Sequence, residues 1–159
     1  MTSPQTLPSA LGLPVPDFIA ATTGGSFALS AQRGRMLVIY FYPKDNTPGC
    51  TTEAMQFRDL HSEFAAAGAS IFGVSRDSLK SHEGFKAKLG LPFELISDGD
   101  EKVCRLFDVI KTKNMYGKQV MGIERSTFLI DAKGVLRREW RKLKADGHAA
   151  EVLAAVKAL

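Results

Sequence analysis

Six apolar residues follow one another without interruption from Met36 to Phe41. This pattern suits a β-strand covered by protein on both faces, because a strand with one face in water alternates apolar and polar residues. Such strands are typical of parallel sheets, whose two faces are covered by helices. The run therefore predicts a central parallel strand, and this strand leads into the turn Thr-Pro-Gly-Cys at 47–50.

Strand and helix patterns alternate along the rest of the chain. The expected strands are 36–41, 70–74, 93–96, 126–130 and 135–140. The expected helices are one over 50–67 that stops at Gly68, one capped by Asp77 or Ser78 that ends at Gly90, one capped by Asp98 or Asp100 that includes Ile110, and a C-terminal one with Val152, Leu153, Val156 and Leu159 in phase. Asp-Ala-Lys-Gly between the last two strands is a hairpin turn signal.

This order of elements predicts an α/β protein with a thioredoxin-like fold, in which a central mixed β-sheet is flanked by helices on both faces. A chain of 159 residues fits one domain over 1–159, and four prolines make 1–16 an extended N-terminal arm. Cys50 then lies at the carboxyl end of the central strand, where sheets of this kind bind ligands.

Composition argues against several classes of function. The net charge is +4, but the Lys and Arg are spread along the chain, so no nucleic-acid partner is expected. The sequence has no apolar run of the roughly 18 residues that a membrane span needs, so no membrane partner is expected. The first residues, Met-Thr-Ser-Pro-Gln-Thr-Leu-Pro, have neither a basic n-region nor an apolar h-region, so no cleaved leader is expected. Two widely separated cysteines suit a reducing, cytoplasmic location and predict neither a metal site nor a disulfide framework, and no cofactor is expected.

Cys50 stands where a helix is expected to begin. With Thr47 as N-cap and Pro48 as first residue, Cys50 is the third helical residue, and the Thr47 hydroxyl is expected to accept its N–H. The N–H groups of a first helical turn lack intrahelical partners and carry partial positive charge, which favours a thiolate. The sequence therefore predicts a cysteine nucleophile.

Two familiar cysteine chemistries do not fit. A cysteine protease needs a histidine base, but His61 lies about 16 Å further along the same expected helix. His82 and His148 can approach Cys50 only through the fold, and His61 and His82 are expected to be core or boundary residues. A disulfide oxidoreductase needs a second cysteine three positions on, where this chain has Glu53.

The motif Pro43-x-x-x-Thr47-x-x-Cys50, with Arg-Ser-Thr-Phe-Leu-Ile-Asp at 125–131, closely resembles the peroxiredoxins of the bacterioferritin-comigratory-protein, or PrxQ, type. The resemblance spans about residues 13–157. It implies a thiol peroxidase that reduces hydrogen peroxide and organic hydroperoxides through a Cys50 sulfenic acid.

The resemblance also implies roles for the neighbours of Cys50. The N–H groups of Cys50 and Gly49, the Thr47 hydroxyl and the Arg125 guanidinium stabilise charge on the departing oxygen. Arg125 also holds the sulfur as thiolate, and Pro43 shields it from water. Glu53 either pairs with Arg125 and orients it or is a solvated first-turn acid.

The sequence departs from this family in its second cysteine. Met55 and the stretch 82–88 occupy the places where a resolving cysteine is usual, and only Cys104 remains. Cys104 borders an apolar helix face, which favours a buried, inert thiol. The sequence therefore predicts a one-cysteine cycle in which thioredoxin, glutaredoxin or glutathione reduces Cys50.

Other interpretations stay open at this point. Cys104 resolves Cys50 in a second model, through an intramolecular disulfide that needs the first helical turn to unfold. A third model is a thioredoxin-fold binding or chaperone module that keeps the thiol without using it. The polar stretch 111–122 either borders the substrate pocket or is a plain surface loop, and the subfamily resemblance favours a monomer.

Overall fold

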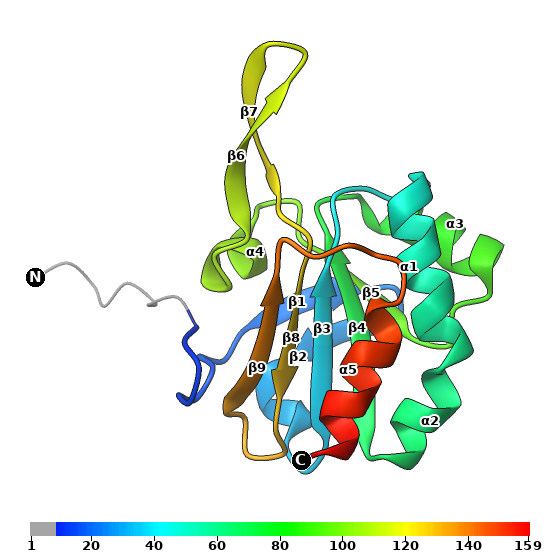
Figure 1. The fold of residues 1–159 in the computed structure, drawn as a ribbon, viewed down its shortest axis with the longest axis vertical. Helices are drawn as coiled ribbons and strands as arrows, with labels where there is room; N and C mark the ends of the chain where they lie inside the picture. The colour runs from blue at the N-terminus through cyan, green and yellow to red at the C-terminus, as the bar shows by residue number, and fades with distance from the viewer. Residues whose placement is uncertain (1–8) are drawn as a thin grey trace, which may run out of the picture.

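The computed structural model describes residues 9–159, and the first half of the proposed N-terminal arm lies outside this range. A mixed sheet has the strand order β2-β1-β5-β4-β3-β8-β9, and β6 and β7 form a separate two-stranded sheet (Figure 1). The strands are β1 (Ile19–Thr22), β2 (Gly25–Ala28), β3 (Met36–Phe41), β4 (Ala69–Ser75), β5 (Glu94–Ser97), β6 (Ile110–Met115), β7 (Lys118–Ile123), β8 (Ser126–Ile130) and β9 (Leu136–Arg141). The helices are the short 3-10 helix η1 (Leu29–Gln32), α1 (Pro48–Asp59), α2 (His61–Ala66), α3 (Leu79–Leu89), α4 (Lys102–Leu106) and α5 (His148–Lys157).

Strand β3 lies in the interior of the sheet, as its apolar run predicts. It pairs in parallel with β4 and antiparallel with β8. Its side chains alternate between two separate cores: Leu37, Ile39 and Phe41 face one, whereas Val38 and Tyr40 face the other. The strand is therefore covered on both faces, which is why it has no polar residue.

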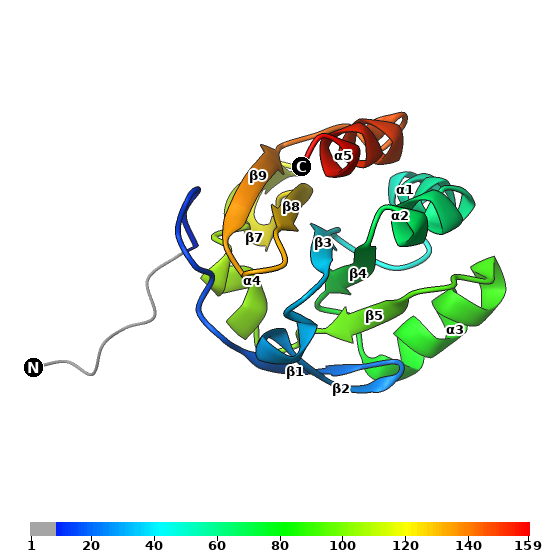
Figure 2. The ribbon, with the colours of Figure 1, turned by 90° about the horizontal axis from the view of Figure 1, so that it is seen from below.

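The two faces of the sheet carry different layers (Figure 2). Buried residues of α1, α2, α3 and α5 pack on the face of Tyr40. Those of η1, α4 and the segment before β1 pack on the face of Phe41. The predicted mixed sheet with helices on both faces is thus confirmed, and the two cores have different neighbours.

The single helix expected over 50–67 is wrong, because the chain forms α1 and α2 with a break at Leu60. Backbone angles at Leu60 (φ −99°, ψ 3°) leave the helical range. Phe57 before the break and Phe64 after it are both fully buried. Tertiary packing therefore sets a new direction for the second segment, although the apolar spacing continues across the break.

The helix expected to reach Ile110 is also wrong, since α4 ends at Leu106. Asp108 has a positive φ of 55°, which interrupts the helix, and Ile110 begins β6. The expected cap is present in altered form: Asp98 accepts the N–H groups of Val103 and Cys104 at 3.0 and 2.7 Å. Helix α3 follows its prediction, with Ser78 as N-cap and Gly90 in the left-handed region.

Two hairpins were not predicted. The stretch 111–122, expected to be a loop, forms β6 and β7, whose exposed side chains lack the apolar alternation of a half-buried sheet. Strands β1 and β2 also pair as a hairpin, and β1 joins the edge of β5. No helix in the described part of the chain is long and apolar enough to cross a bilayer.

Candidate active site

Cys50 lies where strand β3 passes through a short loop into α1. The helix begins at Pro48, and the N–H of Thr51 donates to the Thr47 carbonyl at 2.9 Å. Cys50 is therefore the third helical residue, as the sequence predicts. Its side chain is buried in the core on the Tyr40 face, with 1% of the residue exposed.

Arg125 reaches this sulfur from the position just before the neighbouring strand β8. Phe41, at the end of β3, is in register with Ser126, so Arg125 lies beside the loop that carries Cys50. Its Nη2 group donates to the Cys50 Sγ atom at 3.3 Å. A positively charged donor at this distance stabilises a thiolate and can also bind an oxygen atom that approaches the sulfur.

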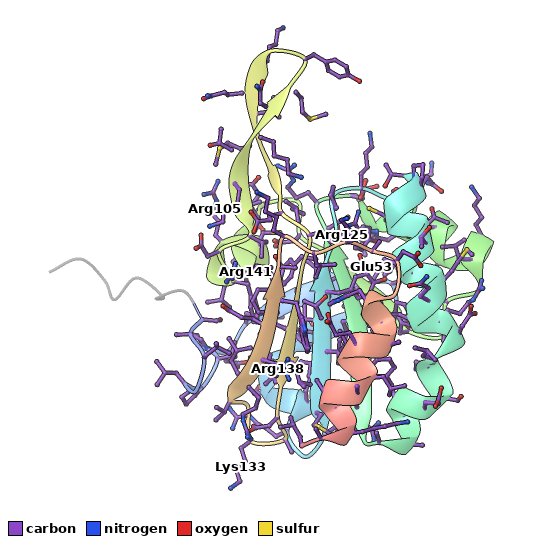
Figure 3. The ribbon with its side chains drawn as sticks, viewed as in Figure 1. Glu53, Arg105, Arg125, Lys133, Arg138 and Arg141 are labelled. Carbon is purple, nitrogen blue, oxygen red and sulfur yellow. The ribbon has the colours of Figure 1, made fainter. Side chains whose placement is uncertain are left out.

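Glu53 fixes the other side of the Arg125 guanidinium. Its Oε1 atom accepts from Nη1 of Arg125 at 2.6 Å, and the two labelled side chains lie together in Figure 3. Glu53 is fully buried and its second oxygen has no partner among the described residues, so the alternative of a solvated acid is wrong. Burial raises the pKa of Glu53 to about 7, although the charge of Arg125 opposes this increase.

Thr47 is the N-cap by position, but its hydroxyl does not make the expected capping bond. Instead, the hydroxyl donates to the Lys44 carbonyl at 2.8 Å, because the loop folds back in front of the helix. Its oxygen lone pairs then remain available as acceptors. Gly49 lies against Arg125, since a Cβ atom there would be 3.2 Å from Nη2. Pro43 is half-buried in the same loop.

A buried polar network, which was not predicted from the sequence, fixes the loop between β3 and Cys50. Asp45 accepts hydrogen bonds from the Tyr42 hydroxyl at 2.6 Å and the Ser81 hydroxyl at 2.8 Å, and it lies 2.7 Å from Nδ1 of His82. Asp77 accepts the Asp45 N–H at 2.9 Å. Asp45, Asp77 and His82 are close enough to share a cation, but these hydrogen bonds already occupy the carboxylates. The cluster therefore ties the loop before Cys50 to helix α3.

We expect Asp45→Asn to lower the free energy of unfolding by about 2–3 kcal/mol at neutral pH, because it disrupts the buried hydrogen bonds that the Asp45 carboxylate makes with Tyr42, Ser81 and His82. Burial alone would raise the pKa of Asp45, but hydrogen bonds from His82 and Tyr42 outweigh it and lower the pKa. A carboxylate of lowered pKa stabilises the fold above its unfolded value of about 3.9 and loses this contribution as pH falls.

Urea unfolding at pH 7 and pH 3.5 measures this effect, and the difference between wild type and variant should shrink at the lower pH. Asp59→Asn is the control, since its ion pair with Arg58 is exposed and should contribute less than about 1 kcal/mol. Equal stability of Asp45→Asn and wild type at pH 7 would show that the network does not hold the loop.

The three histidines are not bases for Cys50 in this structure. His82 is fully buried and its Nε2 atom lies 2.9 Å from the Ile96 carbonyl oxygen. His148 is buried with Nε2 2.8 Å from the Thr127 hydroxyl, and His61 is half-buried at the start of α2. The expectation that His61 and His82 are core or boundary residues is confirmed.

Cys104 lies on the opposite face of the sheet from Cys50. It belongs to the core that contains Phe41, whereas Cys50 belongs to the core that contains Tyr40. Cys104 is fully buried, and burial together with the nearby Asp98 carboxylate raises the pKa of its thiol far above the usual range. Both cysteines are free in the structure.

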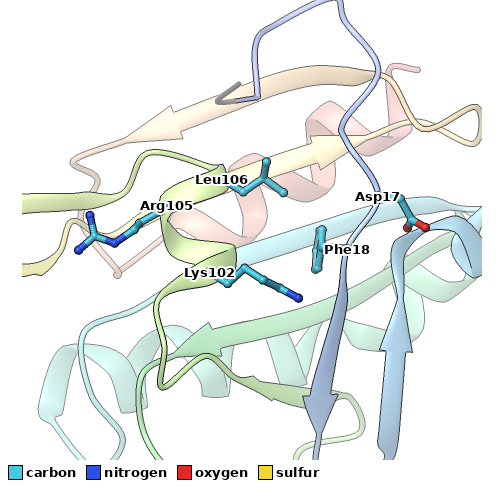
Figure 4. Close-up of a pocket in the computed structure, with 5 residues that line it drawn as sticks. All are labelled: Asp17, Phe18, Lys102, Arg105 and Leu106. Carbon is cyan, nitrogen blue, oxygen red and sulfur yellow. The ribbon is translucent and has the colours of Figure 1, made fainter. Parts of the chain in front are cut away.

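A pocket of about 360 Å³ also opens on the face of Phe41 (Figure 4). It is lined by Asp17, Phe18, Lys102, Arg105 and Leu106. Phe18 and Leu106 belong to the core of Cys104, so the sheet separates this pocket from the Cys50 sulfur. The site around Cys50 is therefore distinct from this pocket and is formed by the loop, α1 and Arg125.

Comparisons with known proteins agree with this geometry. A model of the AhpC/TSA family matches residues 11–139. Peroxiredoxin Bcp of Xanthomonas campestris is 58% identical over 153 residues, which cover 94% of this chain and 96% of that protein. Peroxiredoxin Bcp of Bacillus subtilis is 51% identical, with 92% of this chain and 94% of the relative covered.

Solved structures of peroxiredoxins are also similar to this chain. Xanthomonas campestris Peroxiredoxin Q matches with a TM-score of 0.88 and 59% identity over 94% of this chain and 97% of its own. Two further structures of that protein are mutants in which a cysteine is replaced by serine, at positions 36 residues apart. A yeast mitochondrial 1-Cys peroxiredoxin, described with a thiol resolving mechanism via glutathione/thioredoxin systems, matches with a TM-score of 0.78 and 25% identity over 94% of this chain and 75% of its own.

Fold, site and relatives define a class of protein, the thiol peroxidases with a thioredoxin-like fold, which reduce hydroperoxides at the expense of a thiol. The chain belongs to the AhpC/TSA family, and within it to the peroxiredoxins of the Bcp, or PrxQ, type. The predicted fold and peroxidase activity are thus confirmed, and a non-catalytic binding module is not supported.

Proposed function

We propose that Cys50 is the peroxidatic nucleophile and that it works in a one-cysteine cycle. The observation that carries this proposal is the bond from Arg125 to the Cys50 sulfur, at the start of a helix that offers free N–H groups. The thiolate attacks the nearer peroxide oxygen, a sulfur–oxygen bond forms as the oxygen–oxygen bond breaks, and Cys50 becomes a sulfenic acid. The departing oxygen takes the electron pair and a proton and leaves as water or an alcohol.

The residues around the sulfur supply what this step needs. Arg125 and the first-turn N–H groups of Gly49 and Cys50 are donors for the departing oxygen, whose negative charge grows as the bond breaks. The Thr47 hydroxyl already donates to Lys44, so it acts as an acceptor for the peroxide O–H rather than as a donor. Pro43 excludes water from the loop side of the sulfur.

The sulfenic acid is then reduced by a thiol from outside the chain. Condensation with that thiol forms a mixed disulfide and water, and a second thiol releases Cys50. Two observations support reduction by an external thiol. Cys104 lies on the other side of the sheet from Cys50. The two cysteines mutated in the Xanthomonas campestris relative are 36 positions apart, but the residue 36 positions after Cys50 is Lys86, whose amino group pairs with Glu94. Because the sulfur is buried, the first turn of α1 opens for this step.

The external thiol is a thioredoxin, a glutaredoxin or glutathione, and the enzyme acts as a monomer in a reducing compartment such as the cytoplasm. We expect at least one of these reductants to support continuous peroxide reduction, and Cys104→Ser to keep at least half of the wild-type rate. Peroxide consumption measured separately with each reductant tests this expectation. Loss of turnover by Cys104→Ser with all three would favour the Cys50–Cys104 disulfide cycle instead.

A further inference from the structure

The hairpin of β6 and β7 projects from the body of the protein next to the active site. It pairs with no other strand of the described chain, and Figure 1 shows it extending beyond the end of the main sheet. Its base is fixed by the Glu124 N–H, which donates to the Val109 carbonyl at 2.8 Å. Arg125 follows directly, so the hairpin and the cation that contacts Cys50 share one segment of chain.

The hairpin exposes several large apolar side chains to solvent. Met115, Tyr116, Val120 and Met121 are 50%, 100%, 39% and 52% exposed. The strand register places Met115 and Val120 on one face of the hairpin, together with Lys113 and Lys118, whereas Met121 lies on the other face and Tyr116 in the turn. Neighbouring exposed apolar side chains such as Met115, Tyr116 and Val120 mark interaction sites more often than scattered ones do. An occupant that covers them has to offer some apolar surface of its own.

Tyr116 is also strained by its place in the turn. Tyr116 and Gly117 have φ values of 54° and 78°, the combination of a two-residue hairpin turn that favours Asn-Gly. A positive φ is unfavourable for tyrosine. The side chain is fully exposed, so no packing contact within the chain offsets this energy. Local stability therefore does not explain this aromatic side chain, whereas contact with a partner does.

Charge indicates which partner fits. Residues 110–123 contain three lysines, Lys111, Lys113 and Lys118, and no acidic residue; Asp108, just before this range, pairs with Lys111 at 3.1 Å and leaves Lys113 and Lys118 without an acidic partner in the described part of the chain. A second copy of this chain would bring an equally basic hairpin and a net charge of +4, so self-association here is opposed by repulsion. Nucleic acid would pair with the lysines but leave the methionines and Val120 without apolar contacts. The surface fits an acidic protein with an apolar patch.

The base of the hairpin lies within electrostatic range of the reacting thiol. Burial and the charges of Arg125 and Arg76 lower the pKa of Lys113, and Cys50 opposes this decrease. A protein bound along the hairpin is therefore held beside the sulfur that an external thiol has to reach.

We propose that the β6–β7 hairpin is the docking site of an acidic thiol–disulfide reductant protein of the thioredoxin class, with Tyr116 as its aromatic anchor. This inference rests on the proposed one-cysteine cycle and names the partner for its second half. Glutathione and other small thiols do not need the hairpin, because they approach the sulfenic acid directly. Reduction by a docked protein and reduction by a small thiol should therefore respond differently to changes in the hairpin.

The test uses the full-length protein with Tyr116→Asn and Lys118→Glu, alone and combined. Asparagine suits the positive φ at 116, so this variant removes the aromatic ring and keeps the turn. Lys133→Glu is the matched control, because Lys133 is an exposed cation at the opposite end of the molecule (Figure 3). We expect the combined variant to slow reduction by a thioredoxin of net negative charge by about tenfold, and added salt to slow the wild type more than the variant.

Two further measurements keep this inference separate from the proposed cycle. Reduction by glutathione or dithiothreitol, and the reaction of Cys50 with one equivalent of peroxide, should be unchanged in all these variants. Unchanged thioredoxin rates in the hairpin variants would overturn the docking site, as would equal losses with dithiothreitol or with Lys133→Glu. Sedimentation of the wild type as a dimer that Tyr116→Asn dissociates would also overturn it, in favour of a second copy. Failure of the cycle itself would instead appear as loss of turnover by Cys104→Ser with every reductant.

Discussion

Replacing Arg125 by alanine is expected to slow the reaction of Cys50 with hydrogen peroxide by a factor of about 10²–10³. The guanidinium contacts the sulfur at 3.3 Å and is placed to stabilise the departing oxygen, and loss of one such donor has an effect of this size in other enzymes. Arg125→Lys should recover only part of the rate, because an ammonium group cannot bond to Glu53 and Cys50 in the same forked geometry. Rapid-mixing measurements of one peroxide turnover test both variants.

Loss of Arg125 also leaves the buried Glu53 without its cation, so a control for folding is needed. The pKa of Glu53 in the folded protein, about 7, is above the unfolded value of about 4.3. The contribution of Glu53 to the free energy of unfolding is therefore largest at low pH and is lost as the pH rises from about 4.5 to 7. Without Arg125 the pKa of Glu53 should rise further, so Arg125→Ala should lose stability between pH 6 and pH 8.

The double variant Arg125→Ala/Glu53→Gln should not lose stability over this interval, because it has no buried carboxylate at that position. Urea unfolding at the two pH values makes the comparison. If the double variant recovers stability but not the peroxide reaction, the catalytic effect of Arg125 is separate from its effect on folding. Recovery of the wild-type rate by the double variant would contradict the proposed role of Arg125.

Cys50→Ser is expected to abolish peroxide reduction, because a hydroxyl at this position cannot form a sulfenic acid. Cys104→Ser should retain the wild-type reaction with peroxide, since Cys104 is fully buried on the other face of the sheet. The loss of a well-packed thiol should cost Cys104→Ser some stability, so its folding is checked by thermal unfolding. Residual peroxidase activity in Cys50→Ser above the uncatalysed rate would contradict the assignment of the nucleophile.

The central parts of the fold and site could be predicted from the sequence because their signals are local. The apolar run of β3, the turn before Cys50 and the caps of α3 each depend on a few neighbouring residues. The resemblance of the motifs around Cys50 and Arg125 to one family then placed two distant segments together. The contact between Arg125 and the Cys50 sulfur agrees with that expectation.

The features that were missed depend on residues far apart in the chain. Asp45, Asp77 and His82 form one network only because β3 and β4 end, and α3 begins, at the same side of the sheet. The break at Leu60 follows from burial of aromatic residues on both sides, which spacing alone does not reveal. The β6–β7 hairpin lacks an apolar face, so the only local signal was the Tyr116–Gly117 turn, where tyrosine stands at a position that favours asparagine.

In the proposed cycle, Cys50 reacts with peroxide and is then reduced by a thiol from outside the chain. Peptide mapping of the wild-type protein after one equivalent of hydrogen peroxide, with a sulfenic-acid trapping reagent present, tests it most directly. We predict a trapped sulfenic acid on Cys50 and an unmodified, reduced Cys104. An abundant intramolecular disulfide between Cys50 and Cys104 would contradict it.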